Sequence, residues 1–111
     1  MSQMAEEMPS IVRLEVQPAP DRRRVHFMVE ADGLEPPFPY LELSVLDPDG
    51  QEVGSMLVMG VMEPETRLTV HVRPPAPEGE RRPYLARGRL FYGAEGEEER
   101  TFSVMETPFT F

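Results

Sequence analysis

Hydrophobic and polar residues alternate along most of this chain, in short runs that proline and glycine interrupt. In residues 24–31, Val25, Phe27, Val29 and Ala31 occupy every second position. A period of two places these side chains on one face of a β-strand. Such runs, separated by turn residues about every eight to twelve positions, are typical of an all-β sandwich or barrel. No segment shows the period of an amphipathic helix.

Seven segments fit this strand pattern, at about residues 12–17, 24–31, 40–46, 52–62, 66–73, 84–90 and 98–106. In the first we expect Val12, Leu14 and Val16 to face the core, and in the last Phe102 and Val104. We therefore predict an all-β fold: a single antiparallel β-sandwich of about seven strands. Residues 1–10 are expected to be a flexible N-terminal segment, and residues 11–111 the sandwich domain.

The sequence Asp47-Pro48-Asp49-Gly50 joins the third and fourth segments. Proline at the second position and glycine at the fourth are typical of a β-turn. The same residues share Asp-x-Asp-Gly with part of a calcium-binding loop, but the remaining ligand positions of such a loop are not matched. The pattern favours a hairpin turn.

The sixth segment carries the most specific feature of the pattern. Tyr84 begins it, directly after a loop that contains Glu78-Gly79-Glu80, and two small residues, Ala86 and Gly88, follow on the same face. Together with the seven short strands, this arrangement resembles an immunoglobulin or fibronectin type III sandwich, in which a tyrosine corner occupies the place of Tyr84. There is no cysteine pair and no core tryptophan, so another sandwich, such as a jelly-roll fragment, stays open.

Charge and composition narrow the classes of partner. The formal net charge is −9, from 20 acidic and 11 basic side chains, so the long-range field repels phosphate backbones and anionic lipid. We expect neither nucleic acid nor a membrane as a partner. There is no cysteine, and the first ten residues lack the pattern of a signal peptide. We therefore expect a cytoplasmic protein, and the 13 prolines would suit a thermophile.

Residues that could carry chemistry are few. If the second and fifth strands pair, His26 and His71 lie opposite each other, but two ligands do not complete a zinc site. Ser55 has neither a nucleophile elbow nor a nearby histidine in sequence, which favours an ordinary strand residue. Arginines cluster at residues 22–24 and 81–82, and at net −9 they are expected to balance nearby acids. On the sixth strand, Arg87 and Arg89 are expected to face Glu97 and Glu99 across the final hairpin. We expect no enzyme activity, cofactor or metal.

The segment from residue 52 to residue 62 differs from the others, because neither of its faces is polar and no charge lies between Glu52 and Glu63. Exposed sheet edges in soluble proteins normally carry charge, proline or a bulge. Two interpretations follow: a central strand buried on both faces, or an edge that a partner covers. Methionine suits such a contact, since its side chain repacks easily. The candidate interface residues are Met56, Val58, Met59 and Met62.

The leading hypothesis is a non-enzymatic module for protein–protein contact, with another protein or a second copy of the chain as partner. The alternative is a small-ligand or carbohydrate-binding module that uses Tyr40, Phe91 and Tyr92 as stacking surfaces. Phe109-Thr110-Phe111 at the end of the chain is expected to return to the domain's own core.

Overall fold

The structure is a computed structural model that describes residues 8–73, 82–93 and 98–111. Within these ranges it contains seven β-strands and no helix. The strands are β1 (Ser10–Pro18), β2 (Arg24–Asp32), β3 (Tyr40–Leu46), β4 (Glu52–Met59), β5 (Glu65–His71), β6 (Tyr84–Tyr92) and β7 (Arg100–Phe109). The predicted all-β class is confirmed. The loop with Glu78-Gly79-Glu80 lies outside the described residues.

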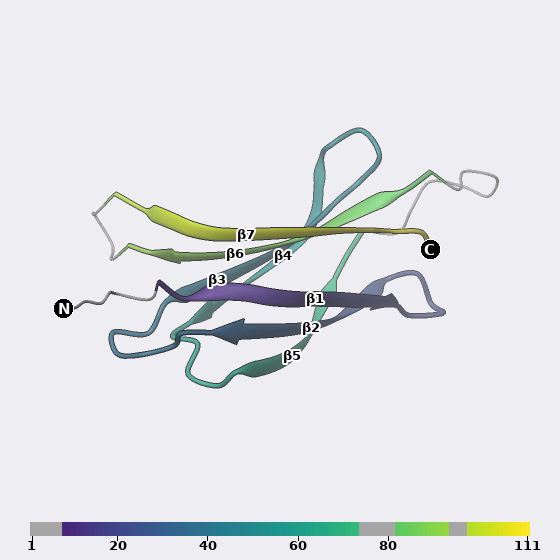
Figure 1. Ribbon diagram of the computed structural model, residues 1–111. Helices are drawn as coiled ribbons and strands as arrows, with labels where there is room; N and C mark the ends of the chain where they lie inside the picture. The colour runs from purple at the N-terminus through teal and green to yellow at the C-terminus, as the bar shows by residue number, and fades with distance from the viewer. Residues whose placement is uncertain (1–7, 74–81, 94–97) are drawn as a thin grey trace.

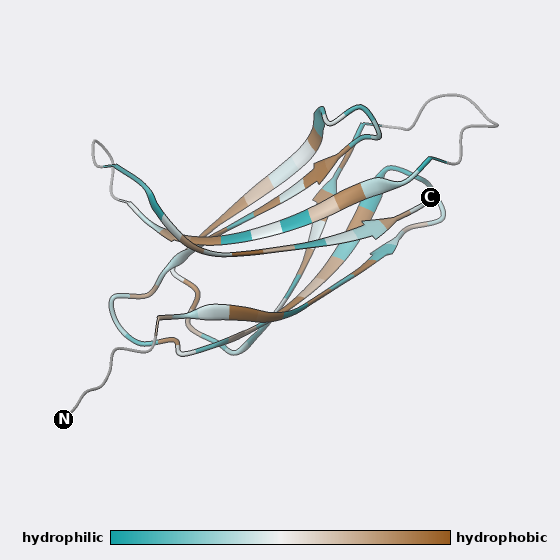
Figure 2. Ribbon diagram, turned by 45° about the horizontal axis from the view of Figure 1, so that its top comes forward, coloured by the Kyte–Doolittle hydropathy of each residue, from teal (hydrophilic) through white to brown (hydrophobic). Residues whose placement is uncertain are grey.

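The strands form two antiparallel sheets that pack face to face (Figure 1). The first sheet has the order β1-β2-β5, and the second has the order β4-β3-β6-β7. Hydrophobic residues lie mainly on the strands, where hydrophilic residues interrupt them, and the turns are mostly hydrophilic (Figure 2). This arrangement confirms the antiparallel sandwich.

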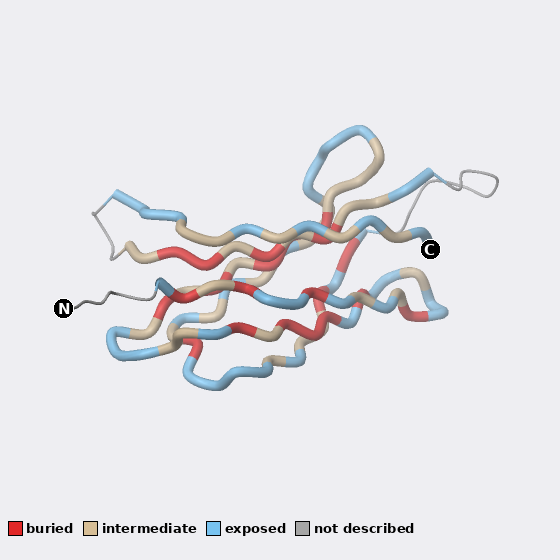
Figure 3. The backbone as a smooth tube through the Cα atoms, in the orientation of Figure 1, coloured by how far each residue is buried: buried red, intermediate tan, exposed pale blue. Residues whose placement is uncertain are grey.

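Buried positions are concentrated on the middle strands of the two sheets (Figure 3). The predicted inward residues of β2 and β3 are all buried: Val25, Phe27, Val29, Ala31, Leu41, Leu43 and Val45. On β6, a Cβ added to Gly88 would lie 3.3 Å from Ile11 Cδ1 of β1. The small residue therefore allows the two sheets to approach closely there.

Two expected inward residues face solvent instead, and a bulge accounts for each. The register of β1 against β2 shifts between Ile11 and Arg13, so Ile11 is buried and Val12 is 45% exposed. The register of β6 against β7 shifts between Leu90 and Phe91, and Val104 is 50% exposed, opposite Arg89. An extra residue in one strand reverses which residues face the core beyond it.

The connection between β3 and β4 is the predicted turn. Gly50 has a φ of +86°, and its N–H donates to the carbonyl of Asp47 over 2.9 Å. The Asp47 carboxylate accepts from the N–H groups of Asp49 and Gln51. At the other end of the chain, Phe109 and Phe111 pack against Tyr84 and the core, as expected.

Candidate functional site

A sandwich of two open sheets has four edge strands, here β1, β5, β4 and β7. An edge strand presents unpaired backbone N–H and C=O groups, which makes it a template for another strand unless something protects it. How each edge is protected therefore locates the surfaces at which a further strand can be added.

The edges β1 and β7 protect each other, because they lie side by side on one flank of the sandwich (Figure 1). The N–H of Ile11 donates to Ser103 Oγ over 2.9 Å, and Thr107 Oγ1 donates to the carbonyl of Leu14 over 3.0 Å. Pro108, near the end of β7, has no N–H to offer. This flank is closed by polar contacts between the sheets.

The edge β5 is protected by charge. Glu65 and Arg67 stand on it and form an ion pair of 2.7 Å. Its partner β2 covers the other side, in a register that runs from Arg24 opposite His71 to Glu30 opposite Glu65. Charged side chains on an edge disfavour pairing with an apolar strand.

The edge β4 is tied down only at its start, among the contacts of the described residues. The N–H of Arg73 donates to the carbonyl of Val53 over 3.0 Å, and Arg73 Nη2 donates to the carbonyl of Glu52. A Cβ added to Gly54 would meet the carbonyl oxygen of His71 and the side chain of Val72. Residues 55–59 lie beyond this junction. They pair with β3 on one side, and no described strand pairs with them on the other side.

The interpretation of this segment as a central strand is wrong, because β4 ends the four-stranded sheet. It is also shorter than expected, since it ends at Met59 and the chain turns at Gly60, where φ is +94°. Its burial alternates between half-buried and exposed, so one face lies on the core and the other is open.

The four candidate interface residues divide between these two environments. Met56 and Val58 are half-buried and pack against the core. Met59 is 75% exposed, and Met62, in the following connection, is 66% exposed. Leu57, which the sequence reasoning missed, is 51% exposed on the same outer face as Met59. The sequence feature that could have identified Leu57 is its place in an uncharged run, between Met56 and Val58.

The two histidines do not form the expected pair. The strands β2 and β5 do pair antiparallel, but His26 lies opposite Thr69, and His71 lies opposite Arg24. His26 Nδ1 and Thr69 Oγ1 form a hydrogen bond of 2.9 Å. Among the described residues no group of three or more His, Cys, Asp or Glu side chains is arranged to hold a metal ion.

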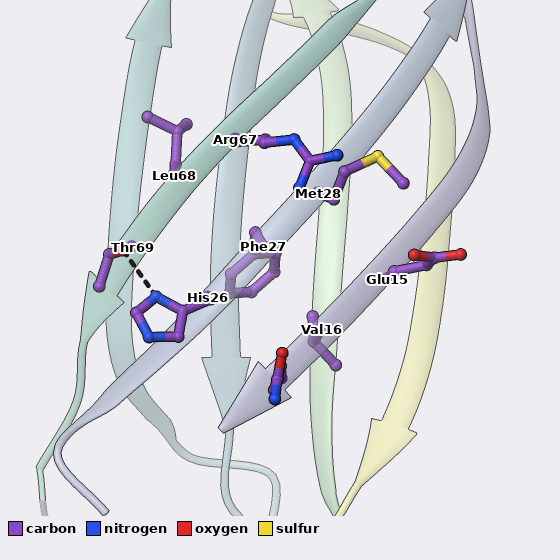
Figure 4. Close-up of a pocket in the computed structure, with 9 residues that line it drawn as sticks. Glu15, Val16, His26, Phe27, Met28, Arg67, Leu68 and Thr69 are labelled. Atoms are coloured by element: carbon purple, nitrogen blue, oxygen red, sulfur yellow. Dashed lines mark hydrogen bonds between the residues drawn. The ribbon is translucent and has the colours of Figure 1, made fainter. Parts of the chain in front are cut away.

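A shallow groove of about 550 Å³ crosses the outer face of the sheet β1-β2-β5 (Figure 4). Figure 4 shows Glu15 and Arg67 on either side of Met28, which forms part of the floor and is 7% exposed. His26 and Thr69, which lie opposite each other on β2 and β5, also line the groove. Glu15 and Arg67 are each in an ion pair within their own strand. The groove offers polar groups around a small apolar floor.

The aromatic residues proposed as a stacking surface are engaged with their neighbours. Tyr40 packs edge-on against Phe91, with ring centroids 5.5 Å apart, and the Arg89 guanidinium lies 4.1 Å from the Phe91 centroid. Phe91 is only 3% exposed. Tyr92 packs on Phe102 and donates its hydroxyl to the carbonyl of Pro37. These rings form no open platform.

Arginines on the sheet face pair with acids. Arg89 contacts both Glu42 and Glu99 at 3.0 Å, and Arg87 contacts Glu106 at 2.7 Å. The expected Arg89–Glu99 pair is present, and Arg87 takes Glu106 as a partner. The other expected partner on the final hairpin, Glu97, lies outside the described residues.

The two loop clusters of arginines also contact carboxylates. In the first, Arg24 Nε donates to Asp21 over 3.0 Å, and the N–H of Arg23 donates to the same carboxylate. In the second, Arg82 contacts Asp49 at 3.0 Å. The neighbour of Arg82 in the sequence, Arg81, lies outside the described residues.

No protein-family model matches the chain, and no curated protein matches it in sequence. In the parts of the chain that the structure describes, no helix is long and apolar enough to cross a membrane.

Proposed function

We propose that this chain is a non-enzymatic module for protein–protein contact, and that the contact is made at the β4 edge. One observation carries the proposal: of the four edges in the described structure, β4 with the connection after it has the longest run without charge, from residue 53 to residue 62, and three large apolar side chains are exposed there. Those side chains are Leu57, Met59 and Met62. Exposed apolar residues that adjoin an unpaired edge mark an interaction site.

A photo-crosslinking residue tests this proposal with a matched control. Leu57 on β4 and Val104 on β7 stand on the outer face of the same sheet and are 51% and 50% exposed. We expect a photoreactive phenylalanine analogue at position 57 to capture one protein reproducibly from an extract of the source cells, identified by mass spectrometry. The same group at position 104 should not capture it. Equal capture at both positions would contradict the proposal.

We further propose that the sandwich is of the immunoglobulin or fibronectin type III kind. In such sandwiches the first, second and fifth strands share one sheet, and the third, sixth and seventh share the other. The orders β1-β2-β5 and β4-β3-β6-β7 agree with this division. The fourth strand lies beside the third. Tyr84 at the start of β6 supports the same relationship.

The groove on the outer face of β1-β2-β5 favours a second candidate function, the binding of a small polar ligand. Its volume of about 550 Å³ lies within the range of ligand sites. An amide and side-chain NMR screen with small sugars, amino acids and dipeptides would test it. Shift changes confined to His26, Met28 and Arg67 would support binding, and no change with any compound would eliminate it.

A further inference from the structure

The net charge of the chain decides where two copies of it can meet. Each copy carries −9, so two copies repel at long range. Direct contact is then least costly where no charges are brought together. The outer face of β1-β2-β5 carries Arg13, Glu15, Glu30, Glu65 and Arg67. The middle of the other outer face carries Glu42, Arg87, Arg89 and Glu106.

Residues 55–59 of β4 are free of this problem. The closest charge across the sheet is Glu42, opposite Leu57 on β3, and it is paired with Arg89 at 3.0 Å. If a second β4 were added to the edge, the two Glu42 residues would stand three strand spacings apart, or about 14 Å. That separation exceeds the screening length of about 8 Å at physiological salt. A basic partner, in contrast, would find no carboxylate to pair with along residues 55–59.

An antiparallel strand can also pair with a copy of itself about a twofold axis, which makes a closed, self-complementary contact. With the axis at Leu57, Leu57 faces Leu57 of the second copy, and Ser55 faces Met59 on the same outer surface. On the core side, Met56 faces Val58. This register uses residues 55–59, the part of the edge that the junction with Arg73 leaves open.

We infer that the occupant of the β4 edge is a second copy of this chain, paired antiparallel through residues 55–59 with the twofold axis at Leu57, so that the two four-stranded sheets become one sheet of eight strands. This inference rests on the proposed function and names its partner. Five residues per copy make a small interface, so the dimer is weak and its population depends on concentration.

Single cysteines report this register directly, because the chain has no cysteine of its own. Residues opposite each other in an antiparallel pair have Cα atoms about 4.5–5.5 Å apart, within the range of a disulfide. We expect Leu57→Cys to form a disulfide-linked dimer under mild oxidation, and a mixture of Ser55→Cys and Met59→Cys to form the mixed dimer. The equally exposed Val104→Cys should stay monomeric under the same conditions.

Absolute mass from light scattering, over a range of protein concentrations, supplies the second readout. Leu57→Glu places two carboxylates opposite each other and should weaken the dimer by about tenfold or more, whereas Val104→Glu should leave it unchanged. Mixing Leu57→Glu with Leu57→Arg should restore association. Wild-type association should strengthen as salt rises from about 0.05 M to about 0.5 M, because salt screens the −9 charges.

A wild-type monomer at every concentration and salt, or equal disulfide formation by Leu57→Cys and Val104→Cys, would overturn the inference. The photo-crosslinking experiment separates this failure from a failure of the proposed function. Capture of a different protein at position 57 would remove the second copy as occupant and keep β4 as a contact edge. Absence of any specific capture, together with a monomer, would remove both.

Discussion

One residue, Gly54, fixes the geometry at the start of β4. Gly54 lies where the strand meets the segment after β5, and a Cβ there would meet the backbone carbonyl of His71. The backbone after this carbonyl is held by the hydrogen bonds that the N–H groups of Val72 and Arg73 donate, so it cannot move aside as a flexible side chain can. The absence of a side chain at this position therefore allows the two sheets to join at one corner of the sandwich.

Gly54→Ala is expected to destabilise the fold by about 2–3 kcal/mol, because the added methyl group must push β4 away from His71. Chemical denaturation would measure the change in the free energy of unfolding. The neighbouring substitution Ser55→Ala, on the exposed outer face, serves as the control and should change it by less than about 0.5 kcal/mol. Equal effects would show that the junction does not constrain the strand.

Asp21 gives a second prediction at this scale. Its pKa is lowered below the usual 3.8, first because its carboxylate accepts a hydrogen bond from the N–H of Arg23, and then through Arg24. Since the folded pKa is below the unfolded one, its stabilising contribution is present at neutral pH and is lost as pH falls through the folded pKa. NMR titration should place that pKa below 3.8. Arg24→Gln should raise the pKa of Asp21 only part of the way toward 3.8, because the hydrogen bond from the N–H of Arg23 remains.

At the scale of the strands, a period of two in the sequence predicts which residues are buried until a bulge interrupts it. On β2 and β3 every expected inward residue is buried, because no register shift interrupts the alternation within either strand's run of buried residues. The prediction that Val12 and Val104 face the core was wrong because each lies at or beyond a bulge. Where a bulge forms depends on the partner strand as well as on the strand itself. The place of β4 in its sheet could not be predicted either, since apolar residues on both faces suit a central strand and an open edge equally.

A substitution to glutamate should lower the free energy of unfolding strongly on the core face of β4 and hardly at all on its outer face. Val58→Glu would put a carboxylate against the core and is expected to cost about 3 kcal/mol or more, or to unfold the chain. Met59→Glu, one residue away and 75% exposed, should change the free energy of unfolding by less than about 0.5 kcal/mol. Thermal melts followed by circular dichroism would measure both. A folded, stable Val58→Glu would show that this side chain does not belong to the core.

At the scale of the whole molecule, the two flanks of the sandwich differ. On one flank β1 and β7 lie together and exchange hydrogen bonds through Ser103 and Thr107. On the other, among the residues that the structure describes, β4 and the end of β5 meet only at the corner near Gly54. These contacts join strands far apart in the sequence, and the alternation within each strand contains no information about them. The candidate site could therefore be found in the sequence as a segment, but not as an open edge.

The closed flank should be measurably stabilising. Ser103→Ala leaves the N–H of Ile11 without its acceptor and is expected to cost about 1–2 kcal/mol in the free energy of unfolding, since an unpaired donor is left behind. Thr110→Ala, at an exposed position beyond the same strand, should be neutral. Hydrogen exchange at the Ile11 amide provides a local readout, and its protection should fall in the first variant only.

The contacts between β1 and β7 also bear on how large an assembly can become. A sheet with two open edges can add copies without limit and grow into a fibre, whereas a sheet with one open edge is complete after a single addition. With β7 turned toward β1, the four-stranded sheet has only its β4 end available within the described structure. If two copies pair at β4 as proposed, the hydrogen bonds of Ser103 and Thr107 would limit the assembly to two copies, and their loss would leave β7 as a second edge through which copies could polymerise.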